Sequence, residues 1–252
     1  MDDECIFTND NSVKIKLIEH NFTSQFSKRD AHEVGFRQIS TFFINKGLVK
    51  NIIDLGAWIG DNSIPWAKNI SGTVYAIDPS PANQAFIRSM CEKNQIYNLK
   101  QIQKAISYKN EFVSTNDSID HCSFGSDTTG RTVLEAVSLD YLLAQKEIET
   151  VDYIHLDVEG MEYKVLVGSD HLIDKCRPII AYEQHLEVDK YEIIGTFLGG
   201  KKAYKIFLID EILPGCRHDC RNFLAIPIEK YSFELIREIT HCVGKPLLVE
   251  ML

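Results

Sequence analysis

Residues 50–80 carry a block pattern of apolar and polar positions that predicts one strand–helix–strand unit. A short apolar run leads into the segment 54–60 (DLGAWIG), and a helix-compatible stretch, residues 63–70, follows it. A second apolar run, residues 73–77, ends at Asp78. This order is typical of parallel strands joined by a helix, and such sheets bind ligands at the carboxyl ends of their strands. The stretch therefore predicts both a fold class and the edge on which a ligand site lies.

The alternation of helices and strands continues on both sides of this unit. Residues 29–46 place Val34, Phe36 and Ile39 at helical spacing ahead of the first strand. The chain then predicts helix 82–96, strand 98–107, a loop or edge hairpin over 108–131, a short helix after 138–140, strand 151–157, helix 163–173, strand 178–183, helix 187–198, and strands 204–210 and 222–228. This succession predicts an α/β fold with a Rossmann-like, doubly wound sheet that is mostly parallel. The last two strands, with no long helix between them, imply an antiparallel strand near the C-terminus.

Composition narrows the expected partners and compartment. The formal net charge of -9 and the pI near 5.4 disfavour a nucleic-acid partner, which needs a basic face. The first residues lack the basic flank and apolar core of a secretory signal, and no run is long and apolar enough to span a bilayer. Seven scattered cysteines are typical of reduced thiols. We therefore expect a cytoplasmic protein, one domain over 1–252, with an N-terminal cap (1–48), a core (49–228) and a C-terminal extension (229–252).

The loop at residues 54–60 is compatible with two kinds of nucleotide ligand. A dinucleotide site favours G-x-G-x-x-G, whereas this loop is D-x-G-x-x-x-G with Trp58 inside it. Asp54 would repel a pyrophosphate but suits the ammonium of an amino-acid moiety. Asp78 can accept hydrogen bonds from both hydroxyls of a ribose. An amino-acid end, a ribose and no phosphate describe S-adenosylmethionine, and an ordinary turn without a ligand is the alternative.

Polar residues gather where the other predicted strands end. These positions are Ser107, Asp157 with Glu159, and Glu183 with His185. An alcohol must lose its proton as it attacks a methyl group, so His185 is the natural base by its intrinsic pKa, with Asp157 as the alternative. A divalent metal on Asp157, Glu159 and Glu183 is chemically possible, but we predict no metal site.

Each of these residues also has a purely structural interpretation. Glu159 precedes a predicted helix and could simply favour its positive end. Asp140 fits a helix N-cap, and His155 inside a strand fits a packed or paired core histidine. The segment 216–220 (CRHDC) lacks a second ligand pair, so a reduced loop is favoured over a zinc knuckle.

Missing motifs help to identify the acceptor atom. The chain has no Asp/Asn-Pro-Pro-aromatic tetrapeptide, the usual mark of amino-group methylation on bases, and no Pro-Cys nucleophile for methylating a pyrimidine carbon. Oxygen is therefore the acceptor that the sequence favours. The expected partner is a small-molecule or glycan hydroxyl.

These elements, in their order along the chain, resemble the FkbM family of methyltransferases. The matching segments are 54–60 (DLGAWIG), 74–79 (VYAIDP), 105–107 (AIS), 138–140 (SLD), 154–160 (IHLDVEG), 165–168 (VLVG), 178–183 (PIIAYE) and 222–227 (NFLAIP). The resemblance implies the class I methyltransferase fold, S-adenosylmethionine as cofactor and methylation of hydroxyl oxygens, with polyketide macrolides and sugars of glycans or lipids among the acceptors.

Carried over residue by residue, the resemblance assigns roles to the loop and to the strand ends. Asp54, Gly56, Ala57 and Gly60 would line the methionine end of the cofactor. Asp78 would bind the ribose, and Asp157 and Glu159 would lie beside the transferred methyl. Ser107, from its place at a strand end, is a further candidate for cofactor binding. Two departures bear on substrate choice and rate: the family usually has Asn in place of Trp58 and Lys in place of His155.

Three functional hypotheses follow. The first is an S-adenosylmethionine-dependent O-methyltransferase acting on a hydroxyl of a sugar, glycan or small metabolite. The second is a vestigial cofactor-binding module in which Trp58 narrows the donor pocket. The third, a nicotinamide-dependent oxidoreductase, is weakened by the missing glycine spacing.

Overall fold

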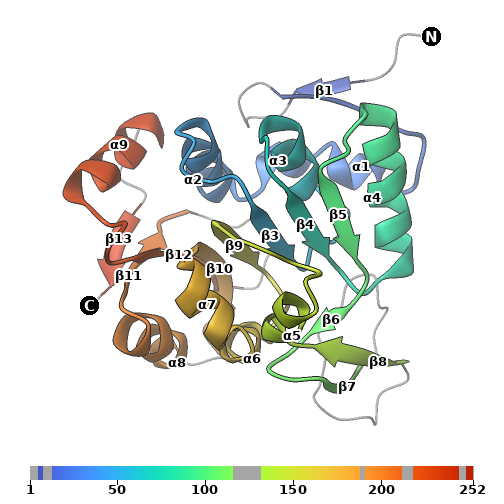
Figure 1. The fold of residues 1–252 in the computed structure, drawn as a ribbon. Helices are drawn as coiled ribbons and strands as arrows, with labels where there is room; N and C mark the ends of the chain where they lie inside the picture. The colour runs from blue at the N-terminus through green and yellow to red at the C-terminus, as the bar shows by residue number, and fades with distance from the viewer. Residues whose placement is uncertain are drawn as a thin grey trace.

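The computed structural model describes residues 5–7, 13–115, 132–187, 191–211, 218–243 and 248–251. Its centre is an eight-stranded sheet in the order β13-β11-β12-β10-β9-β3-β4-β5 (Figure 1). Five neighbouring strands in this sheet are parallel: β5 (Leu99–Ile102), β4 (Val74–Ile77), β3 (Ile52–Leu55), β9 (Tyr153–Leu156) and β10 (Ile179–His185). The parallel core predicted from the sequence is confirmed.

The other end of the sheet is antiparallel. Strand β12 (Cys220–Pro227) runs against both β10 and β11 (Tyr204–Ile209), and β13 (Leu248–Met251) runs against β11. The antiparallel strand expected near the C-terminus is therefore present. The predicted C-terminal extension supplies β13, the edge strand of the same sheet.

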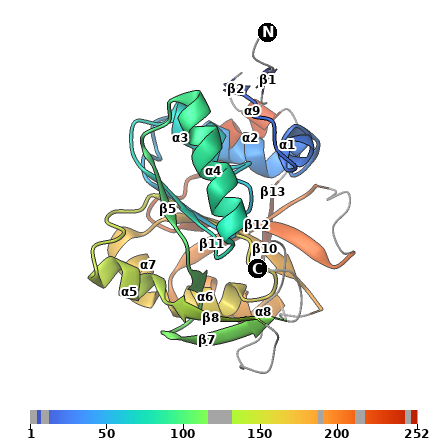
Figure 2. The ribbon, with the colours of Figure 1, turned by 90° about the vertical axis from the view of Figure 1, so that its right-hand side faces the viewer.

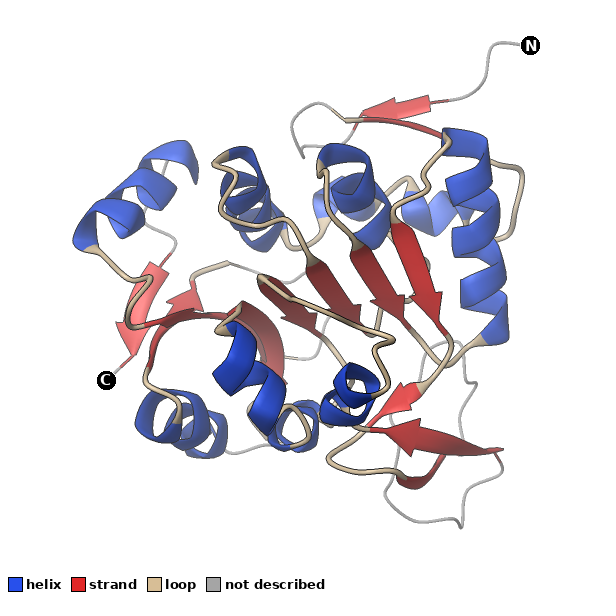
Figure 3. Cartoon of the chain, viewed as in Figure 1, coloured by secondary structure: helices blue, strands red, loops and turns tan. Residues whose placement is uncertain are grey.

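Helices cover both faces of the sheet (Figure 3). One face carries α2 (Val34–Asn45), α3 (Ser63–Asn69), α4 (Pro81–Asn94) and α9 (Phe233–Val243), and the other carries α5 (Leu139–Ala144), α6 (Glu162–Val167), α7 (Asp170–Cys176) and α8 (Tyr191–Gly195). Ile52 packs in the core on the first face and Ile53 in the core on the second. Burial on both sides explains why the strands read as unbroken apolar runs. No helix among the described residues is long and apolar enough to cross a membrane.

The N-terminal segment lies on the face that α2, α3 and α4 cover (Figure 2). It contains β1 (Cys5–Phe7), β2 (Lys14–Lys16), α1 (Thr23–Phe26) and the short 3₁₀ helix η1 (Arg29–Ala31). The single helix predicted over 29–46 is wrong at its start. Glu33 adopts a left-handed conformation (φ 47°), which separates η1 from α2.

The predicted strand 98–107 and the hairpin after it form two different sheets. β5 belongs to the main sheet, whereas β6 (Ala105–Ile106) pairs with β8 (Thr132–Val137) in a small sheet whose third strand is β7 (Glu111–Thr115). β7 and β8 are antiparallel, as expected for an edge hairpin. The part of this prediction that falls on residues 116–131 lies outside the described residues.

Two predicted helices are each divided. The helix predicted over 163–173 is two, α6 and α7, and Asp140 accepts hydrogen bonds from the backbone N–H groups of His171 (3.0 Å) and Leu172 (2.8 Å) at the start of α7. Asp140 thus caps a neighbouring helix, while Ser138 caps α5. The helix predicted over 187–198 is α8 followed by a π-helix, η2 (Thr196–Lys201), which includes Gly199 and Gly200.

Candidate functional site

A cavity of about 550 Å³ opens beside the carboxyl ends of β3, β9 and β10. This volume is within the range of small-molecule sites. The strand ends form one wall and the N-terminal segment forms the other; the lining residues are Gln25, Lys28, Arg29, His32, Glu33, Arg37, Gly56, Trp58, Asp61, Asn62, His155, Asp157, Glu159, Glu183 and His185. Of the predicted site residues, the cavity brings together Gly56, Asp157, Glu159 and His185.

Asp54 lies beneath this cavity as the partner of a buried histidine. Its Oδ1 is 2.7 Å from Nδ1 of His155, and Ser63 Oγ donates to its Oδ2. The imidazole stacks on Phe36 at 4.6 Å between ring centroids. Burial opposes the charge on His155, but the carboxylates of Asp54, Glu33 and Asp61 outweigh burial and raise the pKa of His155. His155 is the paired core histidine that the sequence predicted, and each oxygen of Asp54 has one partner within the protein.

The loop after β3 uses its backbone to fasten neighbouring strands. The N–H groups of Gly56 and Ala57 both donate to the carbonyl of Ile77, at 3.0 and 3.1 Å. Gly56 has φ 74°, and a Cβ there would lie 1.7 Å from the carbonyl oxygen of Asp157, so only glycine fits. Ala57 and Gly60 are buried and do not line the cavity.

Asp78 is largely occupied by hydrogen bonds within the protein. Its Oδ1 accepts from Ser80 N (2.8 Å) and Asn83 Nδ2 (3.1 Å), and its Oδ2 accepts from Trp58 N (3.0 Å). Burial raises its pKa to about 7 against these hydrogen bonds. A carboxylate offers about four acceptor positions, so one position remains for a ligand. Trp58 itself has φ 43°, a left-handed conformation that a tryptophan rarely adopts.

Ser107, like Asp54, Ala57, Gly60 and Asp78, is not among the residues that line the cavity, and it also lies off the main sheet. It is fully buried just after β6, in the small sheet, and its hydroxyl donates to Glu111. The reason is the division of the predicted strand 98–107, which takes Ser107 off the main sheet. The role of Ser107 in cofactor binding stays a prediction.

The ends of β9 and β10 place two carboxylates beside one imidazole. His185 Nε2 lies 3.2 Å from Glu183 Oε1 and 3.5 Å from Glu159 Oε2. These carboxylates raise the pKa of His185 to about 10, against the opposing effect of burial. Burial and the nearby Glu183, Glu33 and Glu159 raise the pKa of Asp157 well above its usual range. His185 therefore carries its proton at neutral pH in this arrangement, which disfavours it as the resting base.

Glu162 stabilises the turn between Asp157 and α6. The structural interpretation of the sequence had given the role of the acid at the start of this helix to Glu159. Glu162 Oε1 accepts from Val158 N (3.0 Å) and Gly160 N (3.1 Å). Glu159 has φ 53° and directs its carboxylate to His185 instead. The Glu162 position was missed, although an acid in the first turn of a predicted helix is a recognisable signal.

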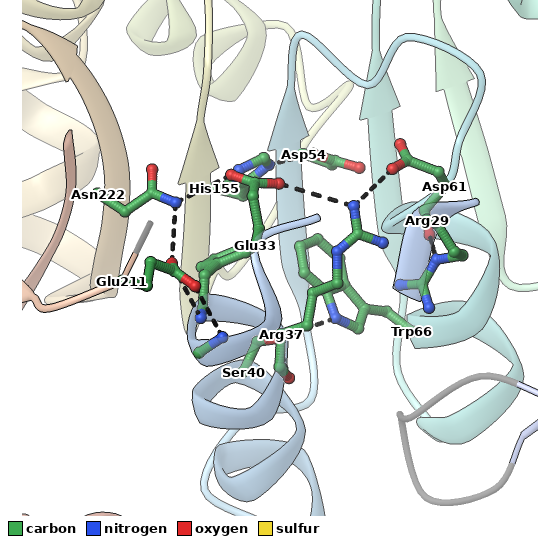
Figure 4. Close-up of polar contacts among 12 residues, drawn as sticks. Arg29, Glu33, Arg37, Ser40, Asp54, Asp61, Trp66, His155, Glu211 and Asn222 are labelled. Atoms are coloured by element: carbon green, nitrogen blue, oxygen red, sulfur yellow. Dashed lines mark hydrogen bonds and ion pairs between the residues drawn. The ribbon is translucent and has the colours of Figure 1, made fainter. Parts of the chain in front are cut away.

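The opposite wall of the cavity is an ion-pair network that the sequence analysis also missed (Figure 4). Arg37 Nη2 lies 2.7 Å from Asp61 Oδ2 and 3.6 Å from Glu33 Oε2, and Arg29 Nε donates to the backbone carbonyl of Asp61. Burial acts to raise the pKa of Asp61, but Arg37 and Arg29 outweigh it and lower that pKa. The i,i+4 spacing of Glu33 and Arg37 was the one visible signal.

Two further missed residues join this wall to the antiparallel end of the sheet (Figure 4). Glu211 accepts from the N–H groups of Gly35 (2.8 Å) and Phe36 (3.3 Å) in the first turn of α2. Asn222 Nδ2 bridges Glu33 Oε1 (3.0 Å) and Glu211 Oε1 (3.2 Å). The strained Glu33 is thereby fixed from both sides.

The segment predicted as a reduced loop does not form a zinc knuckle among its described residues. His218 is 82% exposed at its side chain and lies 2.9 Å from Glu187, whereas Cys220 is buried in β12. Cys216 lies outside the described residues.

Comparison with known proteins identifies the family. Residues 54–213 match the model of the methyltransferase FkbM domain, well over half of the chain. No curated protein matches the chain significantly.

Solved structures share the fold at low identity. A crystal structure of methyltransferase FkbM from Methylobacillus flagellatus matches with a TM-score of 0.53 and 16% identity, over 81% of this chain and 52% of that one, so this chain spans about half the length of that relative. An O-methyltransferase from Bacillus cereus in complex with SAH matches with a TM-score of 0.51 and 12% identity, over 83% and 91% of the two chains. The magnesium protoporphyrin IX methyltransferase of Synechocystis with bound SAM gives 0.50 and 14%, over 84% and 86%. These structures show the Rossmann-like class I methyltransferase fold.

The parallel core, the glycine loop after β3 and the family match together favour a methyl donor, rather than a dinucleotide, as the ligand. The chain belongs to the FkbM family of methyltransferases, whose cofactor is S-adenosylmethionine.

Proposed function

We propose that the protein is an S-adenosylmethionine-dependent O-methyltransferase that acts on a hydroxyl of a sugar, a glycan or a small metabolite. The observation that carries the proposal is the carboxylate-rich wall of the cavity formed by Asp157, Glu159 and Glu183. A hydroxyl is a poor nucleophile until its proton is removed, and a carboxylate at hydrogen-bond distance is a suitable acceptor.

Asp157 is the residue best placed to accept that proton. It follows β9 directly beside Gly56, and its Oδ1 is buried without a hydrogen bond to any described residue. Asp157 lines the cavity, and an incoming hydroxyl requires an acceptor without a partner there. Glu159 and Glu183, held by His185, would then orient the acceptor rather than take its proton.

The cavity also has the chemistry that the cofactor needs. Bound S-adenosylmethionine supplies an electrophilic methyl group on a positively charged sulfonium. Asp157 and Glu159 on the cavity wall complement that charge and the charge of the ammonium. Asp78, which is not among the lining residues, keeps one acceptor position for a ribose hydroxyl. The cofactor-binding role of Asp54 has less support, because its carboxylate is 1% exposed and serves as the counter-charge of the buried His155.

A non-catalytic cofactor-binding module is the second candidate, and a specific observation favours it. Trp58 lines the cavity in a strained conformation while its N–H occupies Asp78. A loop held in this conformation would narrow the space for the methyl donor.

The experiment that tests the proposal separates binding from turnover. The purified chain is titrated with S-adenosylmethionine and S-adenosylhomocysteine by calorimetry, and then incubated with the methyl donor and a panel of sugars, glycans and small alcohols. Mass spectrometry detects a methyl ether, and we expect wild type and the exposed control Glu147→Gln to form it equally.

In the same panel, Asp157→Asn is expected to lose about 10²- to 10⁴-fold in rate, the usual contribution of a positioned base. Binding without a methyl ether on any acceptor would favour the non-catalytic module. Failure to bind either compound would contradict both candidates.

A further inference from the structure

We propose that Glu183, His185 and Cys220 form a binding site for one divalent metal ion of the zinc type. One ligand atom from each of these three buried residues lies within 4.8 Å of the others. The set joins residues that the sequence placed in separate motifs, the end of the fifth strand and the segment 216–220.

The sheet itself brings these side chains together. Glu183 and His185 are two residues apart on β10, so they share a face. His185 is the cross-strand partner of Cys220 on β12, and directly opposed residues in an antiparallel pair present their side chains on the same side. The arrangement therefore rests on regular strand geometry, which holds ligands more firmly than a loop does.

His185 gives the second observation that points to a ligand. Its side chain is 6% exposed, yet neither ring nitrogen makes a well-directed hydrogen bond with a described residue. The 3.2 Å approach of Nε2 to Glu183 is short in distance but poor in direction, so we regard it as an ion-pair contact only. A buried imidazole without directed partners is a costly feature that a metal ion would remove.

The ligand types select the kind of ion. Thiolate and imidazole together favour zinc and related transition metals, whereas magnesium and calcium prefer oxygen alone. In a tetrahedral site with bonds of about 2.0–2.3 Å, the ligand atoms lie roughly 3.5 Å apart. Binding would therefore draw the three atoms slightly closer.

Two neighbouring carboxylates complete the environment. Glu159 Oε2 lies 3.5 Å from His185 Nε2, and Asp219 Oδ1 lies 3.9 Å from Nδ1. Either can orient the imidazole or supply an additional oxygen ligand, as carboxylates commonly do beside metal-bound histidines.

The site borders the cavity, because Glu183 and His185 line it. A cation there would lie on the wall where the acceptor hydroxyl is expected and would favour the ionised oxygen. This consequence rests on the proposed methyl transfer, whereas the metal site itself does not.

The test measures metal uptake without any acceptor. The full chain is treated with a chelator, dialysed and titrated with Co²⁺, with Zn²⁺ as a competitor. We expect one equivalent of Co²⁺ to bind and to give a near-ultraviolet thiolate-to-cobalt charge-transfer band that Zn²⁺ abolishes. Absence of uptake, or uptake without this band, would overturn the proposal.

Single substitutions identify the ligands. Cys220→Ser should abolish the charge-transfer band, and His185→Gln and Glu183→Gln should each weaken Co²⁺ binding by more than about 100-fold. Cys242→Ser, an exposed thiol, is the matched control and should leave the band unchanged. Circular dichroism verifies that each variant is folded, and a band that survives in folded Cys220→Ser would contradict the assignment. Calorimetry with S-adenosylmethionine on the same samples reports cofactor binding separately.

Discussion

Asp54 on β3 and Asp157 after β9 occupy similar places in the sequence, each near the carboxyl end of a parallel strand. They differ in how their oxygens are hydrogen-bonded. Asp54 is enclosed, with one oxygen on His155 and the other on Ser63. Asp157 follows β9, where its N–H donates to the carbonyl of Leu55 on β3 (3.1 Å), and its Oδ1 has no hydrogen bond among the described residues. Acids that hold the fold together are satisfied by the protein, whereas acids that serve a ligand retain unused acceptor positions. This difference is visible only in the hydrogen bonds.

The largest effect should come from removing the enclosed acid. Asp54→Ala leaves His155 buried without its counter-charge and is expected to lower the free energy of unfolding by about 3–5 kcal/mol. Denaturant unfolding at pH 6 measures it. The double variant Asp54→Ala/His155→Leu should recover part of the loss, and Asp157→Asn should stay within about 1 kcal/mol of wild type. Equal losses for Asp54→Ala and Asp157→Asn would erase the distinction between the two regions.

Gly56 is the contact between the two regions, and a methyl group there should be nearly as damaging. Gly56→Ala combines the cost of a left-handed alanine with overlap against the Asp157 carbonyl, about 2–5 kcal/mol together. Gly47→Ala is the matched control: it also has a left-handed φ (67°), but nothing lies within 4 Å of its added Cβ. Its expected cost is about 1 kcal/mol. Similar costs at the two glycines would show that the close approach is unimportant.

Cofactor binding tests the second region, the one that contains Asp157. A sulfonium facing Asp157 would favour its ionised form against the neighbouring carboxylates that raise its pKa. Asp157→Asn removes that charge, so it should weaken S-adenosylmethionine about tenfold, or 1.4 kcal/mol, without weakening S-adenosylhomocysteine, which is uncharged at sulfur. Calorimetry gives both values of Kd at one pH. An equal change for both ligands would place Asp157 away from the methyl group.

The His155 pair should also give the fold a pH dependence. Asp54, Glu33 and Asp61 raise the pKa of His155 in the folded state above its unfolded value of about 6.5. Protonation therefore stabilises the fold fully below about pH 6.5, and this contribution is lost as the pH rises through the folded pKa. The difference in unfolding free energy between wild type and His155→Gln should shrink by on the order of 1 kcal/mol from pH 6 to alkaline pH. A difference that is constant or grows with pH would rule out a charged His155.

The smallest expected effect concerns the tryptophan of the loop. Trp58→Asn replaces a side chain that lines the cavity with one that tolerates the left-handed conformation better. We expect S-adenosylmethionine to bind roughly threefold more tightly, about 0.6 kcal/mol. Weaker binding would mean that the indole ring supports the cofactor instead of narrowing its space.

The sequence by itself determined the architecture. Unbroken apolar strands, the glycine segment 54–60 and the alternation with helices predicted the parallel sheet and the edge that holds the cavity, because burial on two faces leaves a strong local pattern. The same pattern placed Asp157 and Glu159 at the carboxyl end of a strand, and both line the cavity. The ends of elements were predicted less well. The helix predicted over 163–173 is divided into α6 and α7, and the start of α7 is capped by Asp140, which belongs to another element.

Only the tertiary structure decided which polar residues share the cavity and which are already occupied. Arg29, Glu33 and Arg37 reach the site from a segment that the sequence predicted only as a helix within an N-terminal cap. Asn222 joins them from nearly two hundred residues away. Ser107 leaves the site because its strand changes sheets. Hydrogen bonds between residues far apart in the sequence depend on their proximity in the fold. The periodic pattern of apolar residues contains no information about that proximity.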